Sequence, residues 1–347
     1  MKHKTLLLSV CLALAATAAA HATGEGSRLT LALTGDIMMG TDYPSPQLPP
    51  QEGRQLFVEA APVLTRATVA AGNLEGVMAD GGTSTKKLSR SSYAFRTPSA
   101  FAPRLSEAGF DFVSLANNHA FDFGADGAAS TRRLLQAEGI AFAGLKDSPN
   151  AAVIERDGVK IGFCAFGHNA YTWRHQDLET ARQAITRLVN ECDIVVVSFH
   201  GGAEGRNHSR LPYGKETFYG EDRGSLRDFA HFCIDAGADV VFGHGPHVPR
   251  AIELYKEHLV AYSLGNFCTP YGISLTGVSG LAPLLELQVT PDGRFLQGCI
   301  HSFIQRRGHG PSVDPDHRAA REIKRLTALD MPLTPLVIAD DGLISRK

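Results

Sequence analysis

The sequence lacks a strong excess of charge of either sign. Its 347 residues carry a formal net charge of −2 at pH 7. A chain this close to neutral offers no electrostatic argument for binding nucleic acid or an anionic membrane surface. We therefore expect no nucleic-acid partner.

The sequence also lacks any pair of cysteines in the C-x-x-C spacing. Five cysteines follow the first 22 residues: Cys164, Cys192, Cys233, Cys268 and Cys299. An odd number leaves at least one thiol unpaired, even in an oxidising compartment. Scattered buried thiols are therefore a simpler interpretation than a disulfide framework.

Internal repeats and dividing linkers are missing as well, so we expect one domain over residues 23–347. Residues 1–22 are expected to form a cleavable signal peptide, because Lys2 and Lys4 precede an uncharged apolar run. The segment Ala20-His21-Ala22 then provides an A-x-A cleavage site. The mature protein is expected to be soluble and secreted or periplasmic. The alternative is an uncleaved membrane anchor.

Short apolar runs bounded by polar residues predict strands buried on both faces. They lie at residues 29–33, 112–115, 194–199, 240–242 and 259–264. Amphipathic stretches predict helices at residues 98–108, 125–138, 178–190 and 224–236, and this alternation indicates an α/β architecture. We expect loops at residues 44–53, 81–92 and 301–317.

Polar side chains follow five apolar runs at the point where each run ends. They are Asp36, Glu75, the pair Asn118 and His119, His200, and the pair His244 and His247. In open α/β sheets, ligands bind beyond the carboxyl ends of the strands. Imidazole nitrogen mixed with carboxylate and amide oxygen suits Zn, Mn or Fe better than Mg or Ca. The set therefore predicts a divalent metal site.

Each of these residues has a plainer interpretation when it is taken singly. Asp36 could cap a helix, and Asn117-Asn118 could form a turn. His200 before two glycines could be a loop histidine. The metal hypothesis depends on the ordered combination, in which every element falls directly after a strand.

Several segments resemble the signature segments of the CapA (poly-γ-glutamate capsule synthesis) family over about residues 29 to 270. They are Asn73-Leu74-Glu75-Gly76, residues 114–119, Asp122-Phe123-Gly124, residues 243–249 and residues 262–267. The resemblance implies a metallophosphoesterase-like four-layer α/β/β/α sandwich with two mixed β-sheets. It also implies a role in making, exporting or anchoring poly-γ-glutamate or a related surface polymer.

The resemblance also implies roles for single residues. Asp36 matches the first-strand aspartate, and Glu75 stands where a bridging aspartate stands. Asn118 matches a metal ligand, and His119 matches an acid near the leaving group. His200 matches the central histidine ligand, and His244 and His247 match the closing pair.

Three departures distinguish this sequence from the metallophosphoesterase pattern. Met38 stands where an imidazole is expected, and two residues rather than one separate His244 from His247. Gly201 and Gly205 replace aromatic residues, while Glu204 remains. A thioether is a soft ligand, so we expect one tight metal position, made by Asn118, His200, His244 and Glu75. The second, made by Asp36, Glu75 and His247, is expected to be weaker.

The expected reaction is metal-assisted hydrolysis, of either a phosphoester or an amide bond of γ-linked polyglutamate. We expect substrate contacts from Arg96, Glu204 and Arg206. The two arginines, together with Arg210, could bind phosphate or carboxylate. The plainer interpretation of each arginine is a solvated surface residue. Lys86, Lys87 and Arg90 could meet an acidic polymer. Membrane-bound polymer synthesis proteins are possible partners. The alternative function is a non-catalytic accessory protein that binds or exports the polymer.

Overall fold

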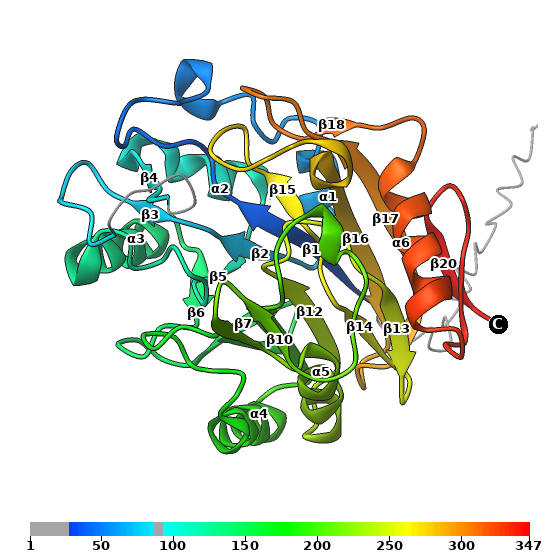
Figure 1. Ribbon diagram of the computed structural model, residues 1–347. Helices are drawn as coiled ribbons and strands as arrows, with labels where there is room; N and C mark the ends of the chain where they lie inside the picture. The colour runs from blue at the N-terminus through cyan, green and yellow to red at the C-terminus, as the bar shows by residue number, and fades with distance from the viewer. Residues whose placement is uncertain (1–27, 87–92) are drawn as a thin grey trace, which may run out of the picture.

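The computed structural model describes residues 28–86 and 93–347 (Figure 1). The predicted signal peptide, together with Lys87 and Arg90, lies outside the described residues. In the part of the chain that is described, no helix combines the length and apolarity needed to cross a membrane.

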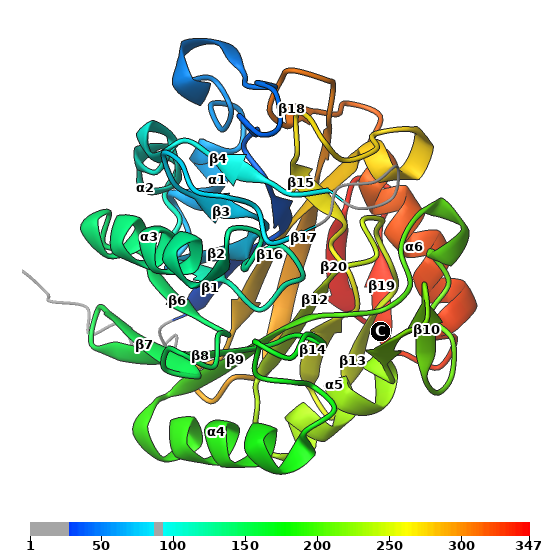
Figure 2. The same ribbon diagram turned by 60° about the vertical axis from the view of Figure 1, so that its left-hand side comes forward.

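A ten-stranded mixed β-sheet forms one half of the centre (Figures 1 and 2). Its order is β19 (Leu336–Ile338), β20 (Leu343–Arg346), β17 (Phe295–Ile304), β16 (Leu281–Val289), β1 (Leu29–Ile37), β2 (Val69–Leu74), β5 (Phe112–Ser114) and β6 (Ala141–Ala143). In addition, β15 (Asn266–Cys268) pairs with β1, and β18 (Ser312–Val313) pairs with β17. The strands from β1 to β6 in this order are parallel, whereas β16 runs antiparallel to β1.

A six-stranded mixed sheet forms the other half. Its order is β13 (Ile252–Tyr255), β14 (His258–Ala261), β12 (Val240–His244), β9 (Ile194–His200), β8 (Val159–Phe166) and β7 (Ala151–Arg156). The four inner strands are parallel, and the two outer strands are antiparallel to their neighbours. Two short pairs lie outside these sheets: β3 (Val77–Met78) with β4 (Arg96–Thr97), and β10 (Glu216–Phe218) with β11 (Glu221–Gly224).

Alternating side chains from both sheets form the core between them. Leu31 and Leu33 of β1 join this inner core, while Ala32 faces the opposite side of the sheet. This follows from the two-residue period of a strand. Phe112 of β5 and Phe163 of β8 stack across the gap between the sheets, with ring centroids 4.4 Å apart. Strands covered on both faces read as continuous apolar runs, which is why the sequence revealed them.

Helices cover the outer faces of the sheets (Figure 2). The helices α1 (Ala61–Leu64), α2 (Pro103–Ala108) and α3 (Gly124–Ala137) contribute apolar residues to the cluster on the larger sheet. The helices α4 (Leu178–Glu191) and α5 (Leu226–Asp235) do the same on the smaller sheet. The Asp177 carboxylate accepts a hydrogen bond from the Thr180 backbone N–H and caps α4. The predicted four-layer α/β/β/α sandwich is confirmed.

The remaining elements lie nearer the rims of the sheets. The helix α6 (Arg318–Asp330) packs against β16 and β17. Single-turn helices form at η1 (Pro50–Gly53), η2 (Ser99–Phe101), η3 (Arg206–His208) and η4 (Gly277–Gly280). The five cysteines are free thiols, and Cys164, Cys233 and Cys268 are buried. The predicted domain extent of 23–347 stays a prediction.

Some predicted element boundaries were wrong. The expected loop at 301–317 begins as strand, because β17 continues to Ile304 in antiparallel pairing with β16, and the short strand β18 lies within it. The expected helix at 98–108 is divided into η2 and α2 at Pro103, whose ring occupies the first position of α2. The expected strand at 259–264 ends at Ala261, and the expected loop at 44–53 ends in η1.

Candidate metal site

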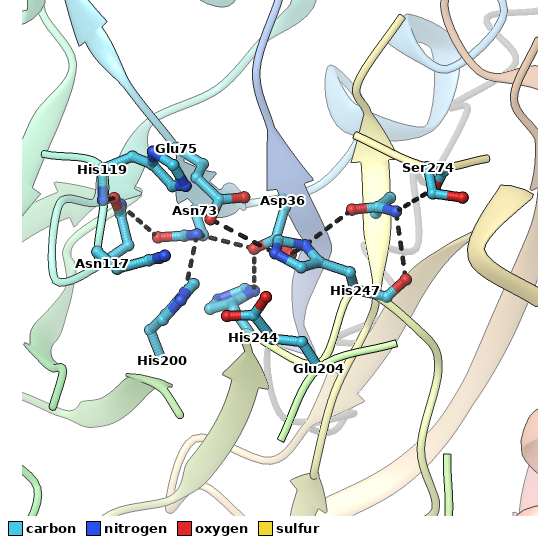
Figure 3. A network of polar contacts seen from close by, with 12 residues as sticks. Asp36, Asn73, Glu75, Asn117, His119, His200, Glu204, His244, His247 and Ser274 are labelled. Carbon is cyan, nitrogen blue, oxygen red and sulfur yellow. Dashed lines mark hydrogen bonds and ion pairs between the residues drawn. The ribbon is translucent and has the colours of Figure 1, made fainter. Parts of the chain in front are cut away.

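The carboxyl ends of parallel strands from both sheets meet at one place (Figure 3). Asp36 of β1 is in register with Asn73 of β2 in the larger sheet. His244 of β12 is in register with His200 of β9 in the smaller sheet. The Nδ1 atom of His244 lies 3.9 Å from Oδ1 of Asp36, so the two sheets bring their polar ends together.

Asp36, Glu75 and His247 converge most closely. Each offers one ligand atom, and these atoms all lie within 4.8 Å of one another. Nδ1 of His247 is 3.0 Å from Oδ2 of Asp36, and Nε2 of His247 is 3.7 Å from Oε1 of Glu75. Among the described residues this is the one group of three or more His, Cys, Asp or Glu that converges in this way. These are the three ligands that the sequence assigned to the weaker position.

Unpartnered polar atoms surround this group. Within the described part of the chain, the buried atoms without a hydrogen-bond partner include both carboxylate oxygens of Glu75, Oδ1 of Asn118, Nε2 of His200 and both ring nitrogens of His244. Buried polar groups in native proteins are normally hydrogen-bonded, so such a concentration needs an explanation. Nitrogen and oxygen donors without thiolate fit a borderline or hard divalent ion. The residues present therefore fit a metal ion.

The charges of the converging group balance internally. Burial opposes a charge on His247, but Glu75 and Asp36 outweigh the burial and raise the pKa of His247 to about 10. Burial raises the pKa of Glu75 to about 8, although His247 opposes this rise. A protonated His247 beside Asp36 and Glu75 thus supplies positive charge at the place where a metal ion would supply it.

His200 and His244 are neutral imidazoles by the same reasoning. Burial lowers the pKa of His244 to about 4, against the attraction of Asp36. Burial, reinforced by His168, holds the pKa of His200 well below its ordinary value. A neutral imidazole keeps a lone pair, which a metal ligand requires.

His247 is held in place by Asn266. Nδ2 of Asn266 donates to the backbone oxygens of His247, Ser274 and Ser279, at 3.2, 3.5 and 3.0 Å. The Asn266 oxygen consequently faces Nδ1 of His247, at 3.0 Å. His247 has a φ of +56°, a left-handed conformation that strains a residue with a side chain and recurs at functional sites. Asn266 therefore stabilises both the backbone and the ring of His247.

Gly245 allows the loop after β12 to approach the backbone next to His200. Gly245 has a φ of +111°, and a Cβ at this position would lie 2.6 Å from the backbone oxygen of Gly201. The close approach of the two backbones is therefore possible only without a side chain.

His119 is oriented by Asp122. Nδ1 of His119 lies 2.8 Å from Oδ2 of Asp122, and Phe95 packs against the imidazole with centroids 4.4 Å apart. Lys86 pairs with the other Asp122 oxygen at 2.6 Å and also donates to the Asn118 backbone oxygen. Burial lowers the pKa of His119, and Asp122 opposes this. Lys86, which the sequence offered as a contact for an acidic polymer, is thus engaged inside the protein.

Asn73 and Asn117 belong to the site, although the sequence analysis assigned them no role. The Asn73 amide nitrogen donates to Oδ1 of Asp36 at 2.8 Å and lies 3.4 Å from Nδ1 of His200. Asn117 donates to the Asn73 oxygen at 3.1 Å. Both asparagines lie in segments that the sequence singled out. The available signal was that Asn73 stands at the end of an apolar run, as Asp36 does; in the structure the two residues are paired in register near the ends of β2 and β1.

The three residues expected to contact substrate differ in their surroundings. Arg96 pairs with Asp42 at 2.7 Å, and its guanidinium lies over the rings of Tyr43 and Phe123. Arg206 is exposed at the start of η3.

Glu204 belongs to the same group of residues (Figure 3) and accepts a hydrogen bond from Arg223 at 2.7 Å. Burial opposes its charge, but His247 and Arg223 outweigh the burial and lower the pKa of Glu204. The substrate roles of Arg96, Glu204 and Arg206 stay predictions.

Two further positions that the sequence singled out are also engaged. Arg210 pairs with Asp330, with Nε and Oδ1 2.6 Å apart. Met38 is fully buried, and its sulfur accepts a hydrogen bond from the Gly40 backbone N–H at 3.3 Å.

Comparisons with known proteins agree with this arrangement. The family described as "Bacterial capsule synthesis protein PGA_cap" matches residues 30–271. The capsule biosynthesis protein CapA of Bacillus anthracis is 28% identical over 336 residues, covering 88% of this chain and 75% of the relative. The PGA biosynthesis protein CapA of Bacillus subtilis is 28% identical over 282 residues, covering 77% of this chain and 70% of the relative. The predicted resemblance is confirmed.

A solved structure shares the fold. A phosphatase from Mycoplasma pneumoniae superposes with a TM-score of 0.50 at 13% sequence identity, covering 86% of this chain and 97% of the other. Identity this low shows common architecture alone. The predicted metallophosphoesterase-like fold is confirmed.

Proposed function

The chain belongs to the family of bacterial capsule synthesis proteins PGA_cap, and on that premise we propose that it is an exported metal-dependent hydrolase that acts on a surface polymer. Poly-γ-glutamate or a related acidic polymer is the proposed substrate. The names of the two CapA relatives, which concern capsule and PGA biosynthesis, support the polymer. The charged start and apolar run of residues 1–22 support export.

The observation that carries the enzymatic part is the concentration of unpartnered ligand atoms. Both Glu75 oxygens lack hydrogen-bond partners although the residue is buried. Without an ion, His247 would offset part of their charge, but the Glu75 oxygens would still lack hydrogen bonds, which is costly. A divalent ion held by Asp36, Glu75 and His247 accounts for them.

When bound, such an ion supplies Lewis acidity and a more acidic water molecule. The chain's own residues supply orientation and proton transfer. Asp122, which pairs with Lys86, can only accept a hydrogen bond as a carboxylate, so Nδ1 of His119 carries the proton and Nε2 the lone pair. Because burial keeps the ring neutral, Nε2 can take a proton from water and pass it to the leaving group, while Asp122 stabilises the ring as long as it is charged.

Recognition of the polymer is assigned to the rim of the site. Arg206 is exposed and lies two residues from Glu204, which belongs to the same group of residues as His247. An exposed guanidinium at this place suits a substrate carboxylate or phosphate. Membrane-bound polymer synthesis proteins remain the proposed partners.

A second candidate is a non-catalytic accessory protein that binds or exports the polymer. The observation that favours it is Met38, whose sulfur is hydrogen-bonded to Gly40 at the position where an imidazole ligand was expected. In this case the ion would bind polymer carboxylates without hydrolysing them.

Metal analysis and an activity assay on the purified mature protein separate the two candidates. The enzyme should bind a divalent ion, shorten poly-γ-glutamate or hydrolyse an aryl phosphate with added Mn, and lose that activity in His119→Ala. An accessory protein should bind ion and polymer, with neither activity detectable. A protein without bound ion under any loading condition would refute both forms of the metal proposal.

A further inference from the structure

We propose that two asparagine side chains, Asn117 and Asn73, restrict the site to one tightly bound ion by placing an amide donor between Asp36 and His200. This inference rests on the proposed metal site and deepens it. It also reverses the ranking expected from sequence, because the tight ion is the one held by Asp36, Glu75 and His247.

The orientation of the Asn117 amide is fixed by backbone groups. Its nitrogen donates to the backbone oxygen of Leu74 at 2.8 Å, and its oxygen accepts from the backbone N–H of His119 at 3.1 Å. A backbone oxygen can only accept and a backbone N–H can only donate. Exchanging the amide oxygen and nitrogen would therefore break both contacts, and the nitrogen of Asn117 must be the group that faces Asn73.

The orientation of Asn73 follows from that of Asn117. The Asn117 nitrogen also donates to the Asn73 oxygen at 3.1 Å, so the Asn73 nitrogen must face the other way. There it donates to Oδ1 of Asp36 at 2.8 Å and approaches Nδ1 of His200 at 3.4 Å. An amide nitrogen has two hydrogens and no lone pair for a metal. All four side chains are completely buried, so water cannot replace these contacts.

The direction of the Asn73 amide limits how many ions the site can bind. Oδ1 of Asp36 and Nδ1 of His200 are both turned toward the same donor group, as Figure 3 shows. An ion bridging Asp36 and His200 would compete with this amide. Oδ2 of Asp36 is not bonded to this amide; it lies 3.0 Å from Nδ1 of His247, in the group that also contains Glu75. The amide pair thus leaves one complete binding position.

Counting ions in three proteins tests the inference. The full mature protein, Asn73→Asp and the control Asn190→Asp would be titrated with Mn or Zn by calorimetry and checked by elemental analysis. Asn73→Asp replaces the amide donor by an oxygen ligand of nearly equal size. Asn190→Asp makes the same chemical change on an exposed position of α4.

We expect one tight ion in the unmodified protein and in Asn190→Asp, and two in Asn73→Asp. The rise in melting temperature on adding metal should also be larger in Asn73→Asp, because a third buried carboxylate needs the cation. Two equally tight ions in the unmodified protein would overturn the inference even if the variant fails to fold. A folded Asn73→Asp with one ion would overturn it as well. Absence of any ion would instead refute the proposed function.

Discussion

Nδ1 of His247 lies 3.0 Å from the Asp36 carboxylate, although Asp36 lies near the end of a strand of one sheet and His247 follows a strand of the other. The distance joins the end of β1 to the loop after β12. It depends on Asn266, whose oxygen lies 3.0 Å from the same ring nitrogen. With Nδ1 engaged on this side, Nε2 is the His247 nitrogen left for a metal ion.

Asn266→Ala should weaken binding of the tight ion about 10- to 100-fold, the usual effect of removing a group that orients a metal-binding histidine. The ring loses its acceptor, and the strained backbone of His247 loses a donor. Calorimetric titration with Zn or Mn measures the change.

The matched control for this prediction is Ser263→Ala. Ser263 donates to the Val248 backbone oxygen and stabilises the same region without contacting His247. Equal losses of affinity in the two variants would mean that Asn266 supports only the loop and not the ring.

The positions of the ligands could be predicted because the strands that deliver them are buried on both faces. Apolar runs such as that of β9 are easily recognised, and His200 is the last residue of that strand. Which atoms converge could not be predicted. It depends on contacts such as that between Asn117 and the Leu74 backbone oxygen, 43 residues apart.

Strand segments that contain polar residues could not be recognised from the sequence. The end of β17 contains His301 and Ser302, so its composition is that of a loop. It is a strand because β16 pairs with it along its whole length, and His301 contacts the Glu286 carboxylate across the pair at 2.6 Å. Pairing with a neighbour can override local composition in this way.

Asp122→Asn should lower kcat by roughly 10²-fold, within the range of general acid–base catalysis, with little change in KM. The neutral amide cannot stabilise a charged His119, although it can still accept its hydrogen bond. The rate of aryl phosphate hydrolysis with added Mn checks this.

Thr85→Val is the comparison for Asp122→Asn. Thr85 donates to the Phe121 backbone oxygen and holds the same segment without carrying charge. An Asp122→Asn enzyme as active as Thr85→Val would exclude the proposed role of the His119–Asp122 pair.

Two buried histidines should make the fold sensitive to acid. Burial lowers the pKa of His175 to about 3 and of His168 to about 4, from an ordinary value of 6.5. The unfolded chain therefore binds more protons between these values, and stability falls as the pH drops below 6.5. For His175 alone the loss is on the order of 3 kcal/mol by pH 4. Above pH 6.5 this contribution is constant.

His175→Leu isolates this effect, because it removes the titrating ring from the buried position beside Phe229. Urea unfolding at pH 7 and pH 4 should show a smaller loss of stability in the variant than in the unmodified protein. His309→Leu, on an exposed histidine, should leave the pH dependence unchanged. An identical acid loss in all three proteins would contradict the prediction.

Met38→His should strengthen a second ion only when Asn73 is changed as well. An imidazole suits Zn or Mn, whereas a thioether does not, so the sequence alone predicts that Met38→His tightens a second site. In the structure, however, the Asn73 amide still donates to Asp36. We therefore expect Met38→His to bind one ion and Asn73→Asp to bind two. In the double variant, the second ion should bind at least about tenfold more tightly than in Asn73→Asp. Titration of the four proteins forms a cycle that isolates the coupling.

Met38→Leu in the Asn73→Asp background is the control, because it removes the sulfur without adding a ligand. A second tight ion in Met38→His alone would mean that the amide is no barrier. No tightening in the double variant would mean that residue 38 lies too far from the second ion to bind it.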